Sequence, residues 1–180
     1  MARPADRRVQ RTHKTLRDAL VRLVIERGWD ELSVKDICDA ADVGRSTFYE
    51  HFAGKEDLLT SGFSDLGVHL RAPRSHPAGT VLRFVQPLFE HALGSRPLFR
   101  ALVGKTSGHV VERRFRSLVL ALVAEELGRA EDDPLVRFLA GGVVELLVSA
   151  LELRDARVDE LDATAQRLAA RLLEAPPDIR

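Results

Sequence analysis

The sequence has little of what disulfide-bonded, metal-binding and membrane proteins need. Among 180 residues the only cysteine is Cys38, so an internal disulfide or a multi-thiolate metal site is excluded. The longest apolar runs, such as residues 118–124, fall far short of the roughly 20 residues that span a membrane. No apolar stretch follows the charged N-terminus. We therefore expect a soluble cytoplasmic protein without a metal, a cofactor or a membrane partner.

Motifs of the common enzyme classes are also missing. The chain has no Gly-rich phosphate loop, no His or Cys pair at metal-ligand spacing and no Gly-x-Ser-x-Gly sequence. Histidines 69, 76, 91 and 109 are scattered over separate segments, and the acidic residues fall mostly at solvated helix positions. These absences argue against an enzyme.

The chain also has no net charge, because 27 basic side chains balance 27 acidic ones. Any affinity for nucleic acid must then come from where the charges lie. Residues 1–17 contain six basic side chains and one acidic, whereas residues 18–62 contain five basic and ten acidic. Positive charge is therefore concentrated at the start of the sequence.

Most of the sequence has the periodicity of α-helices. Apolar residues recur three and four positions apart over residues 9–27, 34–41, 45–52, 55–70, 81–93, 98–103, 108–127, 134–153 and 158–173. No segment keeps the alternation of a strand. With 45% hydrophobic residues, enough for a packed core, this pattern predicts an all-α fold of about nine helices.

Local signals near the N-terminus predict a helix-turn-helix. Gly28 ends the first helix as a C′ residue, and Ser33 with Asp36 forms the acidic variant of a capping box before the second. The sequence Asp42-Val43-Gly44 then tolerates a turn, and a short helix follows from Arg45. Two short helices joined by a tight turn are typical of DNA-binding domains.

The short helix from Arg45 has an apolar back and a polar front. At 100° per residue Phe48 and Phe52 share one side, where they pack with Val43 against the preceding helices. The opposite side and its flanks carry polar groups: Arg45, Ser46, Thr47, Tyr49, Glu50 and His51. A recognition helix needs this arrangement. The alternative is a solvated helix face with no binding function, which has the same arrangement. Glu50 on this side would be repelled by phosphate, unless it accepts from a cytosine amino group or turns aside.

Residues 23–59 resemble the DNA-binding segment of the TetR family of transcriptional regulators. The resemblance rests on Gly28-Trp29, the Ser33 cap, Ile37, the Ala41-x-Val43 turn, the helix Thr47-Phe48-Tyr49-x-His51-Phe52 and Lys55-Glu56, all in register. Asp42 stands where the family usually has Gly or Asn, and Gly44 stands where many members have a Ser or Asn cap. Asp42 still reaches the left-handed region, and Gly44 is an acceptable cap without a side-chain oxygen.

The resemblance implies specific DNA contacts within residues 33–55. Base edges would be read by Arg45, Ser46 and Thr47. Phosphates would be held by Ser33, Tyr49, His51 and Lys55. The chemistry agrees, because arginine bonds guanine bidentately and a threonine methyl contacts thymine. The alternative for Ser33 is that it only caps its helix, and the alternative for Tyr49 is that its ring only packs against the core.

The sequence also suggests a domain division. We place the helix-turn-helix domain at residues 1–55, with a basic N-terminal arm at 1–12, and a helical effector-binding and dimerisation domain at 56–180. The arm residues Arg7, Arg8 and Arg11 are expected to order on DNA and to contact phosphates or the minor groove. A solvated, poorly ordered tail is the alternative for this segment.

The last two predicted helices are expected to form a dimer interface. Residues 134–153 are apolar nearly all round, so this helix must be covered on several sides, and the last helix has one apolar seam. The interface prediction comprises Gly141, Val144, Val148, Leu161, Ala165 and Leu168. A homodimer would place two recognition helices about one DNA turn apart on a palindromic operator. Ordinary core packing of both helices is the alternative.

The resemblance further implies a repressor that a small-molecule effector releases from DNA. Residues that can line an effector pocket are Phe84, Leu88, His91, His109, Phe115 and Phe138. Apolar residues at helical spacing are also what an ordinary core contains. The alternative function is a helical interaction or small-molecule-binding protein that has lost specific DNA binding.

Overall fold

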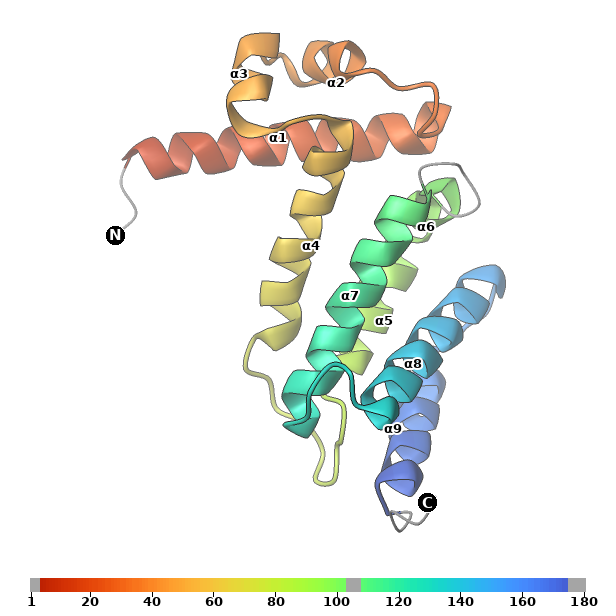
Figure 1. Cartoon of the computed structure of the whole chain (residues 1–180). Helices are drawn as coiled ribbons and strands as arrows, with labels where there is room; N and C mark the ends of the chain where they lie inside the picture. The colour runs from red at the N-terminus through yellow and green to blue at the C-terminus, as the bar shows by residue number, and fades with distance from the viewer. Residues whose placement is uncertain (1–3, 103–107, 175–180) are drawn as a thin grey trace. The chain divides into compact units, whose positions relative to one another are not determined.

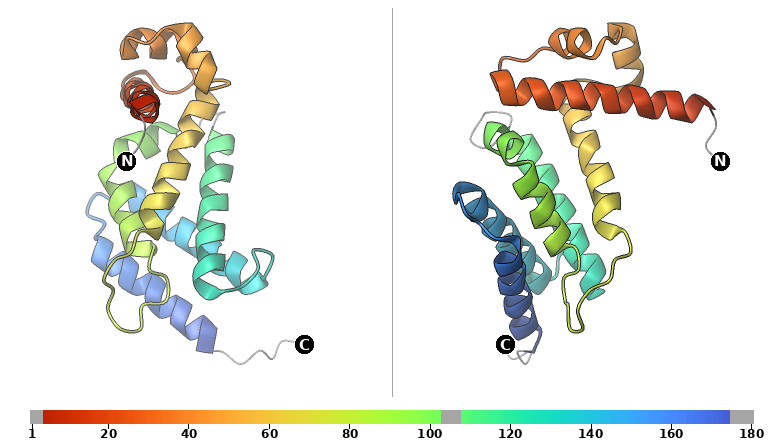
Figure 2. Two further views of the ribbon diagram at one scale, coloured as in Figure 1. Left: turned by 90° about the vertical axis from the view of Figure 1, so that its left-hand side faces the viewer. Right: turned by 180° about the vertical axis from the view of Figure 1, so that it is seen from behind.

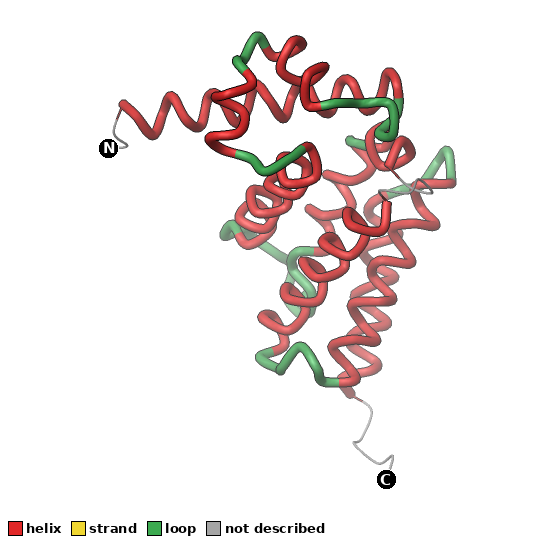
Figure 3. Tube along the Cα trace, turned by 45° about the horizontal axis from the view of Figure 1, so that its top comes forward, coloured by secondary structure: helices red, strands yellow, loops and turns green. Residues whose placement is uncertain are grey.

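The computed structural model describes residues 4–102 and 108–174, and all regular secondary structure in that part is α-helical (Figure 3). The helices are α1 (Pro4–Arg27), α2 (Val34–Ala41), α3 (Arg45–His51), α4 (Lys55–Arg71), α5 (Val85–Gly94), α6 (Arg96–Leu102), α7 (Gly108–Leu127), α8 (Pro134–Glu152) and α9 (Val158–Glu174). The prediction of an all-α fold is confirmed. Most helices begin and end within two residues of the predicted bounds, whereas α1 and α5 begin elsewhere.

The chain divides into two compact units. Unit 1 comprises Met1–Leu66 and Pro97–Arg114, and unit 2 comprises Gly67–Arg96 and Phe115–Arg180. The sequence placed the division at 55/56, but unit 1 continues along α4, because Leu58 is fully buried in its core. Unit 1 also includes α6, whose Leu98 packs against the same core.

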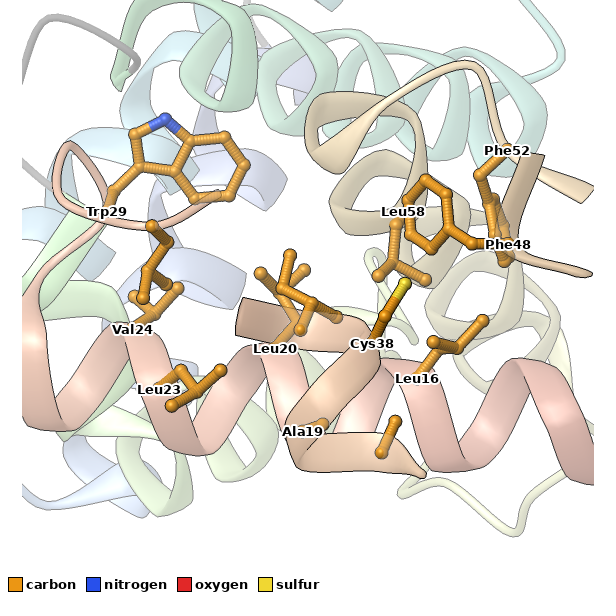
Figure 4. Packing of buried hydrophobic residues seen from close by; sticks show 13 residues of the cluster. Leu16, Ala19, Leu20, Leu23, Val24, Trp29, Cys38, Phe48, Phe52 and Leu58 are labelled. Carbon is orange, nitrogen blue, oxygen red and sulfur yellow. The ribbon is translucent and has the colours of Figure 1, made fainter. Parts of the chain in front are cut away.

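The core of unit 1 joins α1 to the two short helices and the start of α4 (Figure 4). Its buried members are Leu16, Ala19, Leu20, Leu23, Val24, Trp29, Leu32, Ile37, Cys38, Ala41, Phe48, Phe52 and Leu58. The α1 members recur at helical spacing, so they form one stripe that faces α2 and α3, which lie on the same side of α1 (Figure 1). Burial of these side chains therefore fixes α3 by its apolar back.

The first helix begins earlier than predicted. It starts at Pro4 rather than near Val9, and its N-terminal end runs past α3 (Figure 1). Proline is well tolerated in a first turn, where its missing N–H costs nothing. Residues 4–8 have no apolar repeat, so periodicity could not extend the prediction to them. The predicted flexible arm is therefore a helical extension over its described residues.

Unit 2 is built around α5, α8 and α9, which pack against one another (Figure 2). Eight residues of α8 are buried: Val136, Leu139, Ala140, Val143, Val144, Leu147, Ala150 and Leu151. By length and composition α8 is apolar enough to cross a membrane, a property it shares with core helices of soluble proteins. Burial of one face accounts for part of this composition, but Phe138 on the same helix is 66% exposed. Within one chain, therefore, α8 is not covered on several sides as the sequence predicted.

A glutamine side chain explains why α5 begins at Val85 instead of Val81. The Oε1 atom of Gln166 on α9 accepts hydrogen bonds from the backbone N–H groups of Val81 and Leu82, both at 3.0 Å. Its Nε2 atom donates to the carbonyl of Leu82 at 2.8 Å. These contacts satisfy backbone groups outside the helix, so the chain can remain non-helical there.

Candidate nucleic-acid interface

The second helix begins with the predicted capping box. The Ser33 hydroxyl accepts a hydrogen bond from the backbone N–H of Asp36 at 3.2 Å, and Oδ2 of Asp36 accepts from the backbone N–H of Ser33 at 2.9 Å. The hydroxyl also donates to Oδ2 of Asp36. These hydrogen bonds hold the pKa of Asp36 below its ordinary value. The start of α2 is therefore fixed by local contacts alone.

The turn between α2 and α3 also follows its prediction. Asp42 adopts the left-handed conformation, with φ of 52°, and its N–H bonds back to carbonyls of α2. Gly44 caps α3 without a side-chain hydrogen bond. Asp42 thus accommodates the strained position that the family resemblance usually assigns to Gly or Asn.

The third helix presents polar groups opposite its buried back. Phe48 and Phe52 are buried, as predicted, and Val43 packs partly against the same core. Arg45, Ser46 and Glu50 are exposed, while Thr47 is half-buried. The side chain of Tyr49 is 53% exposed, and its ring meets that of Phe48 edge-on at 5.3 Å. The three predicted base-reading residues therefore lie on one short helix, and two of them are exposed.

Two of the predicted phosphate contacts have their donors engaged within the protein. The hydroxyl of Ser33 has one proton, which it donates to Asp36. The ammonium of Lys55 donates to the carbonyls of Trp29, at 3.0 Å, and Leu32, at 2.7 Å. It also lies 4.7 Å from the centroid of the Trp29 ring. Ser33 thus caps its helix in this structure, and its contact with a phosphate stays a prediction.

His51 lies beside a histidine that the sequence did not single out. Its ring meets the ring of His13 edge-on, with centroids 4.8 Å apart, and His13 also contacts Phe52 at 4.7 Å. Burial lowers the pKa of His13 below its ordinary value, and the neighbouring charges of His51 and Arg17 lower it further. Asp65 opposes this shift. Nε2 of His13 is buried without a hydrogen-bond partner among the described residues.

Sequence reasoning could partly have found these neighbours. His13 lies one turn before Leu16 on the same edge of the apolar stripe of α1, which placed it near the core. An ion pair joins Arg17 to Asp65, with Nη2 and Oδ2 2.7 Å apart, and connects α1 to α4. No local signal predicts that pair, because its members are 48 positions apart.

The basic residues near the N-terminus lie on the first helix. Arg7, Arg8 and Arg11 are exposed. The hydroxyls of Thr12 and Thr15 donate to carbonyls four residues earlier, at 3.1 and 2.9 Å, so both are used within α1. The guanidinium groups are therefore presented by a helix rather than by an extended arm.

The predicted pocket residues of unit 2 do not form one group. Phe84, Leu88 and Phe115 are buried, as a pocket or a core requires. His91 and Phe138 are exposed, so neither lines the interior of the protein. The side chain of His109 lies outside the described residues. Phe138 is instead one of the large apolar side chains that α8 presents to solvent, because the buried stripe of this helix lies on its other face.

The predicted dimer residues also separate into two groups. Val144 and Ala165 are buried within one chain, and they are therefore unavailable to a partner in this conformation. Leu168 is 50% exposed, and Gly141, Val148 and Leu161 are half-buried. The sequence could not separate these two groups, because a helix that is apolar on both faces does not reveal which face packs internally.

Comparisons with known proteins agree with this geometry. The family model described as bacterial regulatory proteins, tetR family, matches residues 16–61. The chain is 30% identical over 134 residues to the HTH-type transcriptional regulator TcmR of Streptomyces glaucescens, covering 68% of this chain and 57% of that protein. It is 44% identical over 48 residues to the uncharacterized HTH-type transcriptional regulator YwcC of Bacillus subtilis, covering 27% of this chain and 22% of that protein. The chain thus spans little more than half of TcmR and less of YwcC.

Solved structures extend the similarity over nearly the whole chain. A TetR transcriptional regulator from Streptococcus agalactiae matches with a TM-score of 0.66 at 26% identity, covering 92% of this chain and 97% of that one. A TetR-family regulator from Syntrophomonas wolfei matches with a TM-score of 0.70 over 95% and 99% of the two chains, and at 16% identity this shows the fold alone. These proteins are regulators rather than enzymes. Residues 16–61 therefore match the tetR family of bacterial regulatory proteins, and the chain has the fold of TetR-family transcriptional regulators.

Proposed function

We propose that this chain is a cytoplasmic transcriptional regulator that binds a palindromic operator as a homodimer and represses transcription. The observation that carries the proposal is the orientation of α3. Phe48 and Phe52 bury its back in the core of unit 1, while Arg45, Ser46 and Tyr49 remain exposed on its other sides. A short helix held by one face and polar on the others can enter a major groove.

Base recognition is assigned to the N-terminal half of α3. Arg45 and Ser46 are exposed and Thr47 is half-buried, at the end of the helix that reads base edges in helix-turn-helix proteins. The guanidinium of Arg45 suits the O6 and N7 atoms of guanine, and Thr47 supplies a methyl and a hydroxyl. Each such contact discriminates between bases by roughly 1–3 kcal/mol.

Phosphate contacts are assigned to the basic end of α1 and to Ser33, Tyr49, His51 and Lys55. Tyr49 and His51 flank the base-reading residues, and Arg7, Arg8 and Arg11 are exposed on α1. The hydroxyl of Ser33 donates to Asp36 in the structure, so its contact with a phosphate requires that proton to change partner. These contacts would position the protein on the duplex without selecting a sequence.

A charge-removal experiment tests the DNA contact directly. Affinity for a mixed-sequence duplex is measured at increasing salt for the wild type and for the triple variant Arg7→Gln, Arg8→Gln, Arg11→Gln. We expect the log–log salt slope to become shallower by up to ~2.7, since each phosphate contact contributes about 0.9.

The matched control removes three exposed arginines from unit 2, as Arg83→Gln, Arg129→Gln and Arg157→Gln. It has the same change in net charge, so an equal loss of slope in both variants would contradict a specific contact by α1. A wild type that does not bind duplex DNA at low salt would favour the alternative, a helical protein that has lost this activity.

Dimerisation is assigned to the exposed apolar surface of α8 and α9. On α8 the exposed face carries Phe138, and Leu135 and Leu146 lie half-buried at helical spacing from it. On α9 it is Leu168 that is exposed, with Leu161 half-buried. Exposed apolar side chains gathered in this way mark interaction surfaces. A two-fold dimer through them would use the same patch on both subunits.

Sedimentation of paired variants tests this interface. Phe138→Glu with Leu168→Glu should convert a dimer to a monomer, because the introduced charges would be buried at the interface. The control is Val68→Glu, a similar change at an exposed valine of α4. A monomeric wild type, or a double variant that stays dimeric, would contradict the assignment.

We further infer that a small apolar effector binds in unit 2 and releases the protein from DNA. Phe84, Leu88 and Phe115 supply buried apolar surface there. A screen of small apolar compounds should find one that raises the melting temperature and lowers operator affinity together. Compounds that raise the melting temperature without changing DNA affinity would contradict the release step.

A further inference from the structure

Glu50 is an acidic side chain on the exposed surface of α3. It is the only acidic residue of this helix, which runs from Arg45 to His51. The side chain is exposed, and its position is the second last of the helix. The free carbonyl groups at a helix C-terminus carry partial negative charge, so a carboxylate there is unfavourable. Glu50 therefore does not stabilise the helix that carries it.

The carboxylate of Glu50 has no partner within the part of the chain that the structure describes. None of the residues three or four positions away in the sequence is basic. Within residues 4–102 and 108–174, Glu50 makes no hydrogen bond or ion pair. The imidazole of the next residue, His51, meets the ring of His13, with centroids 4.8 Å apart. The carboxylate is therefore available to a partner outside the chain.

The helical register places Glu50 on the base-reading side of α3. At about 100° per residue it lies about 40° from Ser46 and about 60° from Thr47 around the helix axis, whereas the buried Phe48 lies about 160° away. With a rise of about 1.5 Å per residue, Glu50 is roughly 6 Å farther along the helix than Ser46, which is about two base-pair steps of ~3.4 Å. In a major groove, Glu50 thus faces base pairs next to those read by the first turn.

A carboxylate is selective among base edges because it only accepts hydrogen bonds. In the major groove guanine presents two acceptors, thymine presents an acceptor and a methyl group, and cytosine presents an amino group. Adenine also has an amino group, but its N7 acceptor lies beside it and repels a carboxylate. Where no amino group faces the carboxylate, its loss of hydration and the phosphate charges oppose binding. Cytosine is therefore the base that suits Glu50.

We propose that Glu50 is a specificity-determining residue that selects cytosine in each half-site of the operator. The inference rests on the proposed function, because it needs α3 to lie in a major groove. Glu50 then acts in two ways. Its carboxylate accepts a hydrogen bond from the cytosine amino group, and its charge disfavours every duplex that lacks cytosine at that position. A two-fold dimer places the same cytosine in both half-sites.

The base preferences of three variants test this role. Glu50→Gln keeps the shape of the side chain but removes its charge and adds N–H donors, and Glu50→Ala removes the polar group. Glu26→Gln is the matched control, an equal change at an exposed residue of α1 outside its buried stripe. Each protein selects duplexes from a random pool, and its affinity is then measured for operators substituted at one position at a time. Melting temperatures establish that each variant is folded.

We expect the wild type and Glu26→Gln to prefer cytosine at one position of each half-site by about 5- to 150-fold over guanine or thymine. Glu50→Ala should lose this preference, and Glu50→Gln should shift it towards adenine, whose N6 and N7 atoms suit a glutamine. Because the repelling charge is gone, both Glu50 variants should bind a mixed-sequence duplex more tightly than the wild type does.

The proposal is overturned if the Glu50 variants select the same operator as the wild type, or if the preference that they lose is for another base. An equal loss of the cytosine preference in Glu26→Gln would also overturn it. A lower affinity of both Glu50 variants for mixed-sequence DNA would contradict the repulsion. Failure of the wild type to enrich any sequence would instead reject the proposed function, and this inference with it.

Discussion

Unit 1 and unit 2 are both helical, but they differ in how much of their polar structure is local. Unit 1 combines a local cap and turn with long-range contacts such as the Arg17–Asp65 pair, whereas the contacts that join the helices of unit 2 are long-range. In unit 1 the capping box pairs Ser33 with Asp36, three positions apart. In unit 2 the side chain of Gln166 bonds to Leu82, 84 positions away, and Arg96 donates to the carbonyl of Leu153, 57 positions away. Short-range contacts leave recognisable sequence motifs, whereas long-range contacts do not.

This difference explains why the DNA-binding segment is recognisable and the rest is not. The residues that place α3 lie within one short stretch and follow general rules for caps and turns. The shape of unit 2 depends on pairs such as Arg71 and Glu125, whose bidentate contact has both N···O distances at 2.6 Å. Many other pairs can replace such a contact, so the sequence of unit 2 is free to vary while the fold persists.

The largest effect should follow from removing a large buried side chain from the core of unit 1. Phe48→Ala removes a fully buried ring from the back of α3 and should lower the free energy of unfolding by about 3–5 kcal/mol. Val68→Ala in unit 2, where the side chain is 72% exposed, should change it by less than about 0.5 kcal/mol. Urea denaturation measures both. Similar losses in the two variants would mean that α3 is not held by its apolar face.

A smaller loss should follow from breaking the long-range contact of unit 2. Gln166→Leu leaves two N–H groups and one carbonyl without their partner and should cost about 2–3 kcal/mol, seen as a lower melting temperature. Gln86→Leu is the matched control, since that side chain makes an exposed hydrogen bond to Glu90 on the same helix. Equal effects would show that the Gln166 contacts contribute nothing specific.

Within unit 1 the comparison can be made between base and phosphate contacts. Thr47→Ala should change which bases are preferred, by roughly 1–3 kcal/mol at the affected position. Tyr49→Ala should weaken binding by a similar factor on every operator variant, because phosphate contacts carry no sequence information. Titration against a set of singly substituted operators measures this. Uniform losses for both variants would refute the division of roles.

The smallest effect concerns the pH dependence of unit 1. Because burial lowers the pKa of His13 in the folded state, the unfolded chain binds more protons just below the ordinary value of about 6.5. Stability should therefore fall as the pH drops through that value towards the folded pKa. Burial is the largest cause of the lowered pKa of His13; the charges of His51 and Arg17 add to it, and Asp65 opposes it.

His13→Leu isolates this contribution. Between pH 7.5 and pH 5.5 the melting temperature of the variant should fall by less than that of the wild type. Melting temperatures at pH 8, where His13 is neutral in the folded and the unfolded chain, provide the reference. A wild type and variant with parallel melting curves over this range would show that His13 does not titrate differently on folding.

The sequence predicts unit 1 closely because its signals are local. Asp42 adopts the expected left-handed turn, and Ser33 and Asp36 form the expected capping box. The contacts of Lys55 and His13 could not be predicted, because they depend on carbonyls and rings that only the fold brings near. The sequence places the ammonium of Lys55 at a helix N-terminus, where an anion is a favourable partner. The fold adds two carbonyl oxygens as partners.

The sequence predicts the helices of unit 2, but it does not predict which face of each helix is buried. The bounds of α7 and α8 follow from periodicity and the Pro134 start. Periodicity did not separate Val144, buried within the chain, from Phe138, exposed on the same helix, because α8 is apolar on both faces. Which face packs against α5 and α9 is a property of the assembled unit.

The most direct test of the central claim is selection of bound duplexes from a random pool by the purified protein. An operator-binding dimer should enrich a palindrome whose half-sites are about 34–36 Å apart, and the enriched duplex should bind with a steep salt dependence. Weak binding without any enriched sequence would contradict the assignment of α3 as a recognition helix.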